Sequence, residues 1–124
     1  MPSINRKQIR PKTVEYKHDD KSAVYYNSSA WHSLRNDYYV KHPLCECCMS
    51  HDRVTVADHT HHRKPFLTGI SDNERWQLLL DEGNLMSVCA KCHTALHIKA
   101  KRYNLNYIDE LTDTEYNEAH NINL

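Results

Sequence analysis

The chain has 124 residues, the usual size of a single small domain, and its composition argues against several classes of protein. Only 40% of the residues are hydrophobic, with one Phe against eight Tyr, so the apolar core is expected to be small. There are two Gly, and neither G-x-x-x-x-G-K-[ST] nor G-x-G-x-x-G occurs, which removes the best signal for nucleotide binding. Something other than apolar burial should therefore help to hold the fold.

The formal net charge is zero, but the charges are unevenly distributed. Residues 1–102 contain 16 Lys or Arg and 11 Asp or Glu, whereas residues 103–124 contain five acids and no Lys or Arg. A basic body with an acidic tail is compatible with nucleic-acid contact. Neither a secretory h-region nor an apolar run of membrane-spanning length occurs, so we expect a cytoplasmic protein without a membrane partner. In that reducing compartment, five Cys favour metal ligands over disulfides.

The first expected elements are an arm and a helix. Residues 1–27 are polar and basic and include two Pro, which predicts an extended N-terminal arm. Ser28 or Ser29 can cap a helix that Pro43 stops. The large side chains of this helix recur at helical spacing, and their expected role is packing: Trp31, Leu34 and Tyr38.

A strand and a second helix are expected in the middle of the chain. Residues 53–57 (RVTVA) alternate and are rich in β-branched side chains, which predicts a short strand. Ser71 and Glu74 have the spacing of a capping box. A helix is therefore expected over residues 72–82, with Gly83 as its C′ residue.

The last third of the chain predicts a brief extended segment, a helix and a tail. Residues 84–88 (NLMSV) are expected to be extended, and residues 92–103 to form a helix whose basic C-terminus suits the helix dipole. The acidic residues 103–124 are expected to form a tail or a short helix.

Two Cys-x-x-Cys knuckles are the strongest motif in the sequence. Cys45-x-x-Cys48 and Cys89-x-x-Cys92 are separated by 40 residues. Two thiolates at this spacing can bind one ion, so the two knuckles predict a closed tetrahedral zinc site that ties distant segments together. Cys47 is the extra cysteine, and a Cys45/Cys47 pairing is a less standard alternative. A site of four thiolates has no open position and cannot perform hydrolysis.

A second group of metal-binding side chains consists of histidines. His93 and His97 lie four residues apart on the predicted last helix, so both imidazoles project from one face. Two ligands leave a metal site incomplete. The only dense source of a third is the stretch DHTHH, residues 58–62.

These motifs together resemble a known family. PLCECC, RVTVADHTHHRKP and GNLMSVCAKCHTALH are similar to the HNH endonucleases, which are zinc-knuckled ββα-metal nucleases common in phages and prophages. The upstream YNSSAWHSLRNDYYVKHPLC also resembles phage-type members, so the resemblance covers residues 26–97. It implies an α+β, zinc-stabilised ββα-metal fold with flanking helices. The nuclease domain would be residues 28–102, between the basic arm of residues 1–27 and the acidic tail of residues 103–124.

The resemblance allows two registers for the histidine motif. In phage-type members an apolar strand runs directly into Asp-His or His-His, often with a proline a few residues later. Asp58-His59 is one candidate pair, and we favour it because the predicted strand leads straight into it. The competing register takes His61-His62 as the pair and keeps Pro65 as the proline. In the favoured register, His61 and His62 would support the ligands, contact phosphate or be solvated.

The roles of the site residues follow from the resemblance. His59 would be the general base, whose ordinary pKa suits deprotonation of water. Asn84 would brace the loop that carries the base. Asp58 and His93 would be ligands of the catalytic metal, and His97 the additional ligand of His-rich members. Together with the four cysteines as structural zinc ligands, the resemblance implies one catalytic divalent ion: Zn, Ni, Co or Mn, with Mg less favoured.

The implied reaction is hydrolysis of a DNA phosphodiester, by nicking or double-strand cleavage, to 5′-phosphate and 3′-hydroxyl ends. The expected partner is therefore DNA, and the family alone suggests a phage setting with packaging proteins. Basic residues that could grip the DNA backbone are Arg63, Lys64, Lys99, Lys101 and Arg102, together with the N-terminal arm. The alternatives are a non-catalytic, zinc-stabilised nucleic-acid-binding module and a zinc adaptor for a protein partner.

Overall fold

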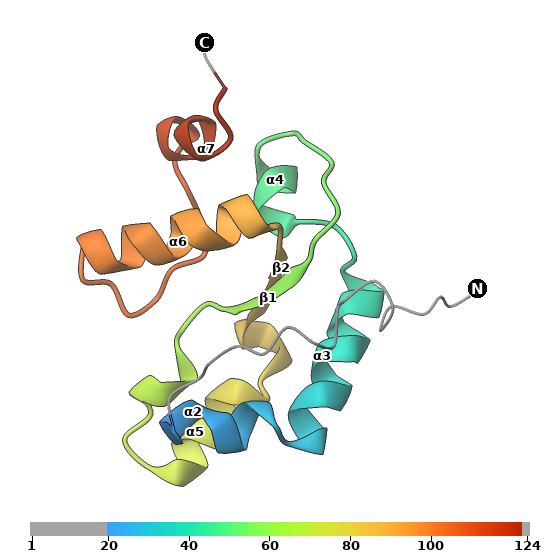
Figure 1. Cartoon of the computed structure of the whole chain (residues 1–124), viewed down its shortest axis with the longest axis vertical. Helices are drawn as coiled ribbons and strands as arrows, with labels where there is room; N and C mark the ends of the chain where they lie inside the picture. Colours follow the sequence, from blue (N-terminus) through green and yellow to red (C-terminus); the bar gives the residue numbers. More distant parts are fainter. Residues whose placement is uncertain (1–19, 123–124) are drawn as a thin grey trace.

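A two-stranded antiparallel sheet followed by a helix lies at the centre of the computed structural model, which describes residues 20–122 (Figure 1). β1 (His59–His62) pairs with β2 (Leu85–Val88), and α6 (Ala90–Arg102) follows directly after Cys89. The paired residues are His59 with Val88, Thr60 with Ser87, His61 with Met86, and His62 with Leu85. The other elements are α2 (Asp20–Tyr26), α3 (Ser29–Lys41), α4 (Glu46–Ser50), η1 (Phe66–Thr68), α5 (Asp72–Leu79), η2 (Glu82–Asn84) and α7 (Asp113–Ala119). The predicted α+β fold is confirmed.

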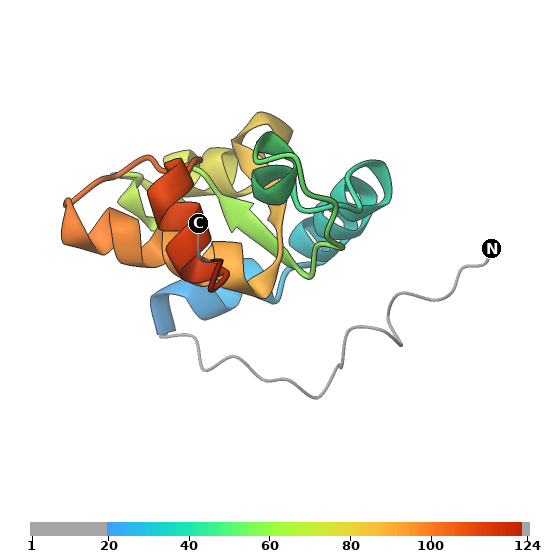
Figure 2. The same cartoon turned by 90° about the horizontal axis from the view of Figure 1, so that it is seen from above.

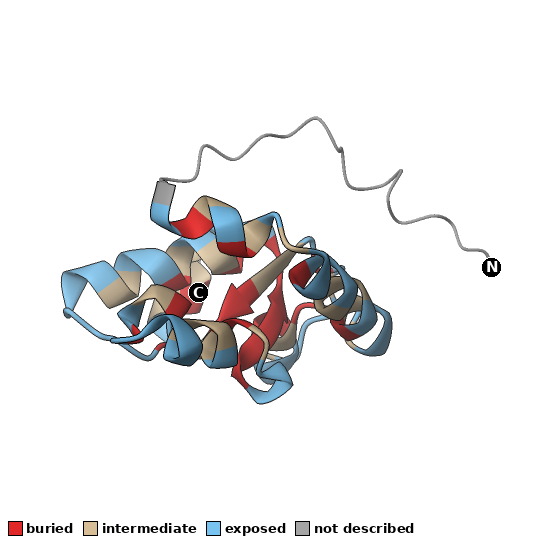
Figure 3. Ribbon diagram, turned by 90° about the horizontal axis from the view of Figure 1, so that it is seen from below, coloured by how far each residue is buried: buried red, intermediate tan, exposed pale blue. Residues whose placement is uncertain are grey.

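Buried side chains form two hydrophobic clusters that meet at the sheet, where Figure 3 shows the strands as mostly buried. Because neighbouring residues of a strand point to opposite faces, Leu85 belongs to one cluster and Met86 to the other. The cluster beneath α2, α3 and α5 is largely aromatic: Tyr25, Trp31, Tyr38, Phe66, Leu79 and Leu85. The second cluster joins all five cysteines to Met86, Val88, Leu96, Ile108, Leu111 and Tyr116.

The predicted N-caps of two helices are confirmed, but one of these helices ends earlier than predicted. Ser28 caps α3 by accepting a hydrogen bond from the Trp31 N–H, and the helix ends before Pro43 as predicted. Ser71 caps α5 by accepting from the Glu74 N–H. The prediction that this helix reaches residue 82 is wrong, because it ends at Leu79 and the chain then forms the 3-10 helix η2.

The strand predicted at residues 53–57 is also wrong. Only Val56 forms a bridge there, to Leu44, and the strand proper begins at His59. Residues 53–57 are used to close the first knuckle, since the Cys45 N–H donates to the Thr55 carbonyl at 2.7 Å. Val56 is 64% exposed, so its β-branched side chain does not pack on a buried face of a sheet.

Both ends of the described chain pack on the domain (Figure 2). The predicted extended arm ends earlier than residue 27, because residues 20–26 form α2 and Tyr25 lies in the aromatic cluster; residues 1–19 lie outside the described residues. The acidic tail contains α7, which begins with a full capping box between Thr112 and Glu115. Within residues 20–122, none of the helices combines the length and apolar character needed to cross a membrane.

Candidate metal centres

The two knuckles bring together four buried sulfur atoms, those of Cys45, Cys48, Cys89 and Cys92. The four Sγ atoms lie within 4.8 Å of one another, and Cys48 Sγ is 3.8 Å from the Sγ atoms of both Cys89 and Cys92. Sulfurs bound tetrahedrally at about 2.3 Å from a zinc ion are about 3.8 Å apart. This cysteine cluster therefore has the dimensions of a zinc site. Cys47 is buried in the same hydrophobic cluster but is not among these four ligands.

Two helix N-termini position the thiols. Cys45 is the N-cap of α4, where its Sγ accepts a hydrogen bond from the Cys48 N–H at 3.3 Å, and Cys89 is the N-cap of α6. A Cys-x-x-Cys spacing thus places the second thiol of each knuckle in the first turn of a helix. The positive ends of two helix dipoles face the cluster, which favours thiolates there.

Helix α7 adds further polar groups to the cysteine cluster. The Tyr116 hydroxyl donates to Cys48 Sγ at 3.0 Å, and His120 Nε2 lies 3.2 Å from Cys92 Sγ. The Tyr116 ring also stacks on the rings of His51 and His120, each at a centroid distance of 4.2 Å. Hydrogen bonds to ligand atoms orient them and tune their basicity, so the tail is part of this site.

The thiols of the cluster differ in their affinity for protons. A hydrogen bond from Cys92 lowers the pKa of Cys45 to about 5, whereas burial raises the pKa of Cys89 to about 11. Zinc binds thiolates, so loading of this cluster should release protons.

The second candidate centre consists of histidines from β1 and α6. Residues 59 and 61 lie on one face of β1 because strand side chains alternate, and His93 and His97 share one face of α6. One ring nitrogen from each of His61, His93 and His97 lies within 4.8 Å of the others. The ring of His59 stacks on His93, with centroids 4.7 Å apart and 14° between the planes. We call His61, His93 and His97 the histidine cluster.

The histidine cluster has the chemistry of a divalent-metal site. The Nε2 atoms of His93 and His97 are 3.0 Å apart. Two nitrogens bound to one ion at about 2.0–2.1 Å are about 2.9–3.4 Å apart at octahedral or tetrahedral angles. Burial lowers the pKa of His61 to about 4 and that of His93 to about 3, and it also lowers the pKa of His97. The rings are therefore neutral at pH 7 and can act as ligands, and His97 is the exposed member of the cluster.

The predicted pair Asp58-His59 lies at the entrance to β1. The Asp58 N–H donates to the Val88 carbonyl at 3.0 Å, which fixes the backbone of the pair against β2. The Asp58 side chain is 59% exposed and the His59 side chain 28% exposed, with Oδ1 of the first 3.7 Å from Nε2 of the second. His59 thus contacts the cluster through His93, whereas Asp58 is not among the three residues of the cluster.

His62, the base of the competing register, lies in the aromatic cluster. Its ring stacks on Trp31 at 5.0 Å, and Nε2 lies 3.2 Å from the Leu79 carbonyl oxygen. Burial lowers the pKa of His62 to about 4. The side chain is therefore an interior group that is only 8% exposed.

Asn84 braces the chain that follows β1. Its Oδ1 accepts from the Lys64 N–H at 2.9 Å, and its Nδ2 donates to the carbonyls of Lys64 at 2.9 Å and Leu78 at 3.1 Å. Three hydrogen bonds from one buried amide hold residues 63–64 against the turn before β2. The role of Asn84 in bracing the loop that carries the base stays a prediction.

The basic side chains expected to contact DNA differ in their surroundings. The Arg63 side chain forms ion pairs within the protein, with Glu46 at 3.6 Å and with Asp109 at 3.4 Å. Lys99 pairs with Glu115 at 2.8 Å. The remaining three are exposed, and no ion pair forms at them among residues 20–122: Lys64, Lys101 and Arg102.

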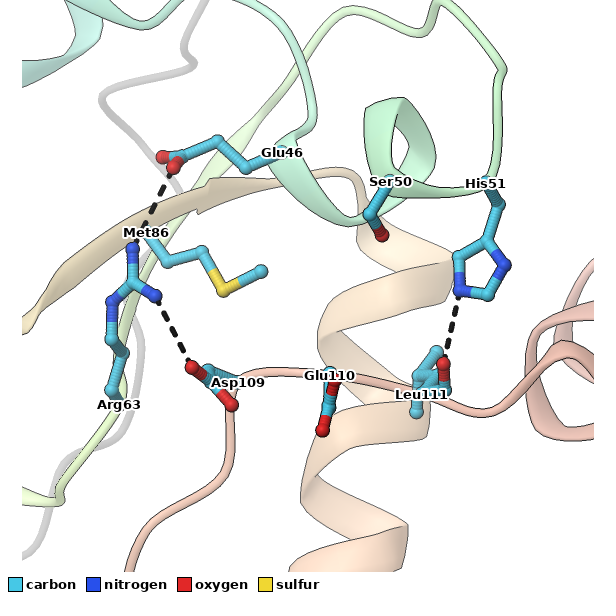
Figure 4. Close-up of a pocket in the computed structure, with 8 residues that line it drawn as sticks. All are labelled: Glu46, Ser50, His51, Arg63, Met86, Asp109, Glu110 and Leu111. Atoms are coloured by element: carbon cyan, nitrogen blue, oxygen red, sulfur yellow. Dashed lines mark hydrogen bonds and ion pairs between the residues drawn. The ribbon is translucent and has the colours of Figure 1, made fainter.

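The pocket around Arg63 is separate from both metal centres (Figure 4). Its walls come from α4, β2 and residues 109–111, and Figure 4 shows the Arg63 guanidinium between the carboxylates of Glu46 and Asp109. No residue of the cysteine or histidine clusters lines it. We assign the pocket a structural role, in which Arg63 ties the tail to the sheet.

A ββα core that carries histidines, beside a closed group of four cysteines, defines a zinc-knuckled ββα-metal domain. Residues 45–99 match the HNH endonuclease family, so the chain contains an HNH endonuclease domain and the resemblance is confirmed. Among solved structures, the chain is similar to the crystal structure of the HNH endonuclease of the deep-sea thermophilic bacteriophage GVE2 with manganese ion. The two share 28% identity and a TM-score of 0.59, over 67% of this chain and 85% of that chain. No curated protein matches the chain.

Sequence reasoning named His61 only in the competing pair or in a supporting role, and it did not consider Tyr116 or His120 as part of a site. His61 belongs to the histidine cluster, and Tyr116 and His120 contact the cysteine cluster. Two-residue periodicity from His59 could have identified His61, had the strand been predicted to start there. No local signal links the tail to the knuckles, because that contact depends on tertiary structure.

Proposed function

We propose that the protein is a metal-dependent DNA endonuclease in which His59 acts as the general base. The observation that carries this proposal is the position of the His59 ring, part-exposed and stacked on His93 at the edge of the histidine cluster. A base must reach both solvent and the metal-bound substrate, and a ring in this position can do so. His62 is buried against Trp31, which disfavours the competing register.

In this proposal each side chain of the site has a distinct task. His93 and His97 hold the divalent ion, with Asp58 as the carboxylate that the resemblance adds to them. When bound, the ion supplies Lewis-acid stabilisation of charge on phosphate oxygens. His59 takes a proton from the attacking water, and Asn84 keeps the adjoining loop in place through its three hydrogen bonds. Zn, Ni, Co and Mn suit these ligands better than Mg.

Contact with the DNA backbone would fall to the exposed cations Lys64, Lys101 and Arg102, with weaker support for Arg63 and Lys99, which are ion-paired within the protein. Such contacts make affinity salt-dependent without choosing a sequence. Partners in phage packaging stay a prediction that rests on the family resemblance.

The proposal is tested by nicking of supercoiled plasmid after chelation and add-back of single divalent ions. His59→Ala should reduce nicking by about 100-fold or more, since general bases contribute about 10²–10⁴-fold. It should retain cobalt binding and salt-sensitive DNA affinity. His32→Ala is the matched control, because His32 is exposed on α3, and it should nick like the parent.

Three results would contradict the proposal. Parent-like nicking by His59→Ala removes the assigned base. Loss of nicking in a folded His62→Ala variant, with His59→Ala active, selects the competing register. Salt-sensitive DNA binding without cleavage under any divalent ion would favour the alternative, a non-catalytic nucleic-acid-binding module.

A further inference from the structure

We infer that His61 is a ligand of the catalytic metal, bound through Nδ1, so that the site offers three imidazoles. The inference rests on the proposed use of His93 and His97 as ligands and adds a residue to them. A ring nitrogen of His61 lies within 4.8 Å of a ring nitrogen of each of the other two. His61 lies two residues after His59 on β1, so both rings face α6.

The hydrogen bond of His61 supports this role. Its Nε2 lies 2.8 Å from the carbonyl oxygen of Ile108. A carbonyl oxygen only accepts, so Nε2 carries the ring proton and Nδ1 carries a lone pair. Metal-binding histidines commonly have this arrangement, with one nitrogen on the ion and the other donating to a backbone carbonyl that fixes the ring.

The backbone around His61 holds that arrangement in place. The Ile108 N–H donates to the Arg63 carbonyl at 2.8 Å, so the tail segment runs beside the end of β1 and presents its own carbonyl to His61. Ile108 is itself buried in the cysteine-side hydrophobic cluster. A ring that is 3% exposed and tethered in this way loses little freedom when it binds an ion.

The other rings around His61 are arranged to share an ion with it. His61 meets His93 and His97 edge-on, with centroid distances of 5.8 and 5.5 Å and interplanar angles of 77° and 88°. These rings are not stacked on His61, and one nitrogen of each of the three rings lies within 4.8 Å of the others. His59 instead stacks face to face on His93, at 14°, which suits a group outside the ligand set.

Three imidazoles change which ions the site prefers. Imidazole nitrogen suits zinc, nickel and other late first-row ions, whereas magnesium prefers oxygen ligands. With His61 included, cobalt and zinc should bind more tightly than magnesium. An exposed carboxylate, that of Asp58, would then be a supplementary ligand rather than the third essential one.

The test is cobalt binding by full-length His61→Gln. Glutamine can place its Nε2 amide near the position of the imidazole Nε2 and keep the bond to the Ile108 carbonyl, but it lacks a nitrogen at the Nδ1 position. Calorimetry and the visible spectrum of Co²⁺ would be recorded after chelation that leaves one zinc per chain. We expect the cobalt affinity of the variant to fall by about 100-fold or more, beyond the effect of losing a group that only supports a ligand. His32→Gln, on exposed α3, should bind cobalt like the parent.

A measurement on the parent protein keeps the inference testable if His61→Gln does not fold. With ¹⁵N-labelled histidine, addition of zinc to the chelated protein should move the Nδ1 resonance of His61 and leave its Nε2 protonated. Unchanged His61 resonances in the zinc-loaded parent, or parent-like cobalt affinity in folded His61→Gln, would overturn the inference. A parent that binds no ion at the histidines would also overturn it.

The nicking assay separates this inference from the proposed function. A parent that nicks plasmid while His61→Gln binds cobalt normally would leave the endonuclease in place and remove His61 from its ligands. A parent that binds the ion through His61 yet cleaves no DNA would keep His61 as a ligand and remove the proposed endonuclease function.

Discussion

The buried His62 ring should make the protein sensitive to mild acid. The ring contacts the aromatic side chains of Trp31 and Phe66, at centroid distances of 5.0 and 5.4 Å, and its pKa is lowered by burial to about 4. In the unfolded chain the same ring has an ordinary pKa of about 6.5. The unfolded state therefore takes up a proton first as the pH falls, so the contribution of His62 to stability is complete above pH 6.5 and is lost between pH 6.5 and 4.

The magnitude follows from the two pKa values. The full difference corresponds to about 3 kcal/mol, and about 2 kcal/mol of it should be lost by pH 5. His62→Gln is a suitable perturbation, because glutamine does not titrate and its Nε2 can still donate to the Leu79 carbonyl. Urea unfolding of parent and variant at pH 7.5 and pH 5 would be compared. The parent should lose about 2 kcal/mol more than the variant over this interval.

The comparison cancels the acid response of the other groups. Protonation of the cysteine and histidine clusters acts on both proteins, whereas only the parent has a titrating group at position 62. Equal losses of stability in parent and variant would refute the reasoning, because they would mean that folding does not change the proton affinity of His62.

Three further outcomes are expected. Cys48→Ser should abolish stoichiometric zinc binding and unfold or strongly destabilise the domain. His97→Ala should leave the melting temperature close to that of the parent and mainly reduce nicking. Thermal melts in the reverse order would contradict the assignment of a structural role to the cysteine cluster and a catalytic role to the histidine cluster. Tyr116→Phe should keep the stacked ring, remove the hydroxyl bond to Cys48 Sγ and speed zinc transfer to a chelator by about 10-fold or more, and an unchanged rate would show that this bond is dispensable. Asn84→Ala should cost about 3 kcal/mol in urea unfolding through three lost hydrogen bonds, and a loss below about 1 kcal/mol would mean that water replaces them.

Local chemistry made part of the structure predictable from sequence. The spacing of the two knuckles identified the four clustered thiols, and Ser28 and Ser71 marked the starts of α3 and α5. The i, i+4 spacing of His93 and His97 placed both on one face of α6. Each of these signals depends on residues close together in sequence, whose geometry the helix or the chelate fixes.

The register of β1 could not be predicted from residues close together in sequence. Residues 53–57 have β-branched alternation, yet they close the first knuckle, and the strand consists of His59–His62, a polar sequence. Its partner β2 and the packing of α6 determine which residues pair. The role of His61 in the histidine cluster depends on that register, and its bond to Ile108 depends on a contact across 47 residues.

Residues 103–122 belong to neither candidate ligand group, yet they contact both: Ile108 lies against His61, Tyr116 against Cys48 and His120 against Cys92. A protein shortened to end at Arg102 would keep every candidate coordinating atom and lose the groups that hold the ligand side chains in orientation. Ion uptake at the two sites would then decline together. If both candidate sites bind ions, their occupancy should depend on residues 108–120 as well as on the ligand side chains.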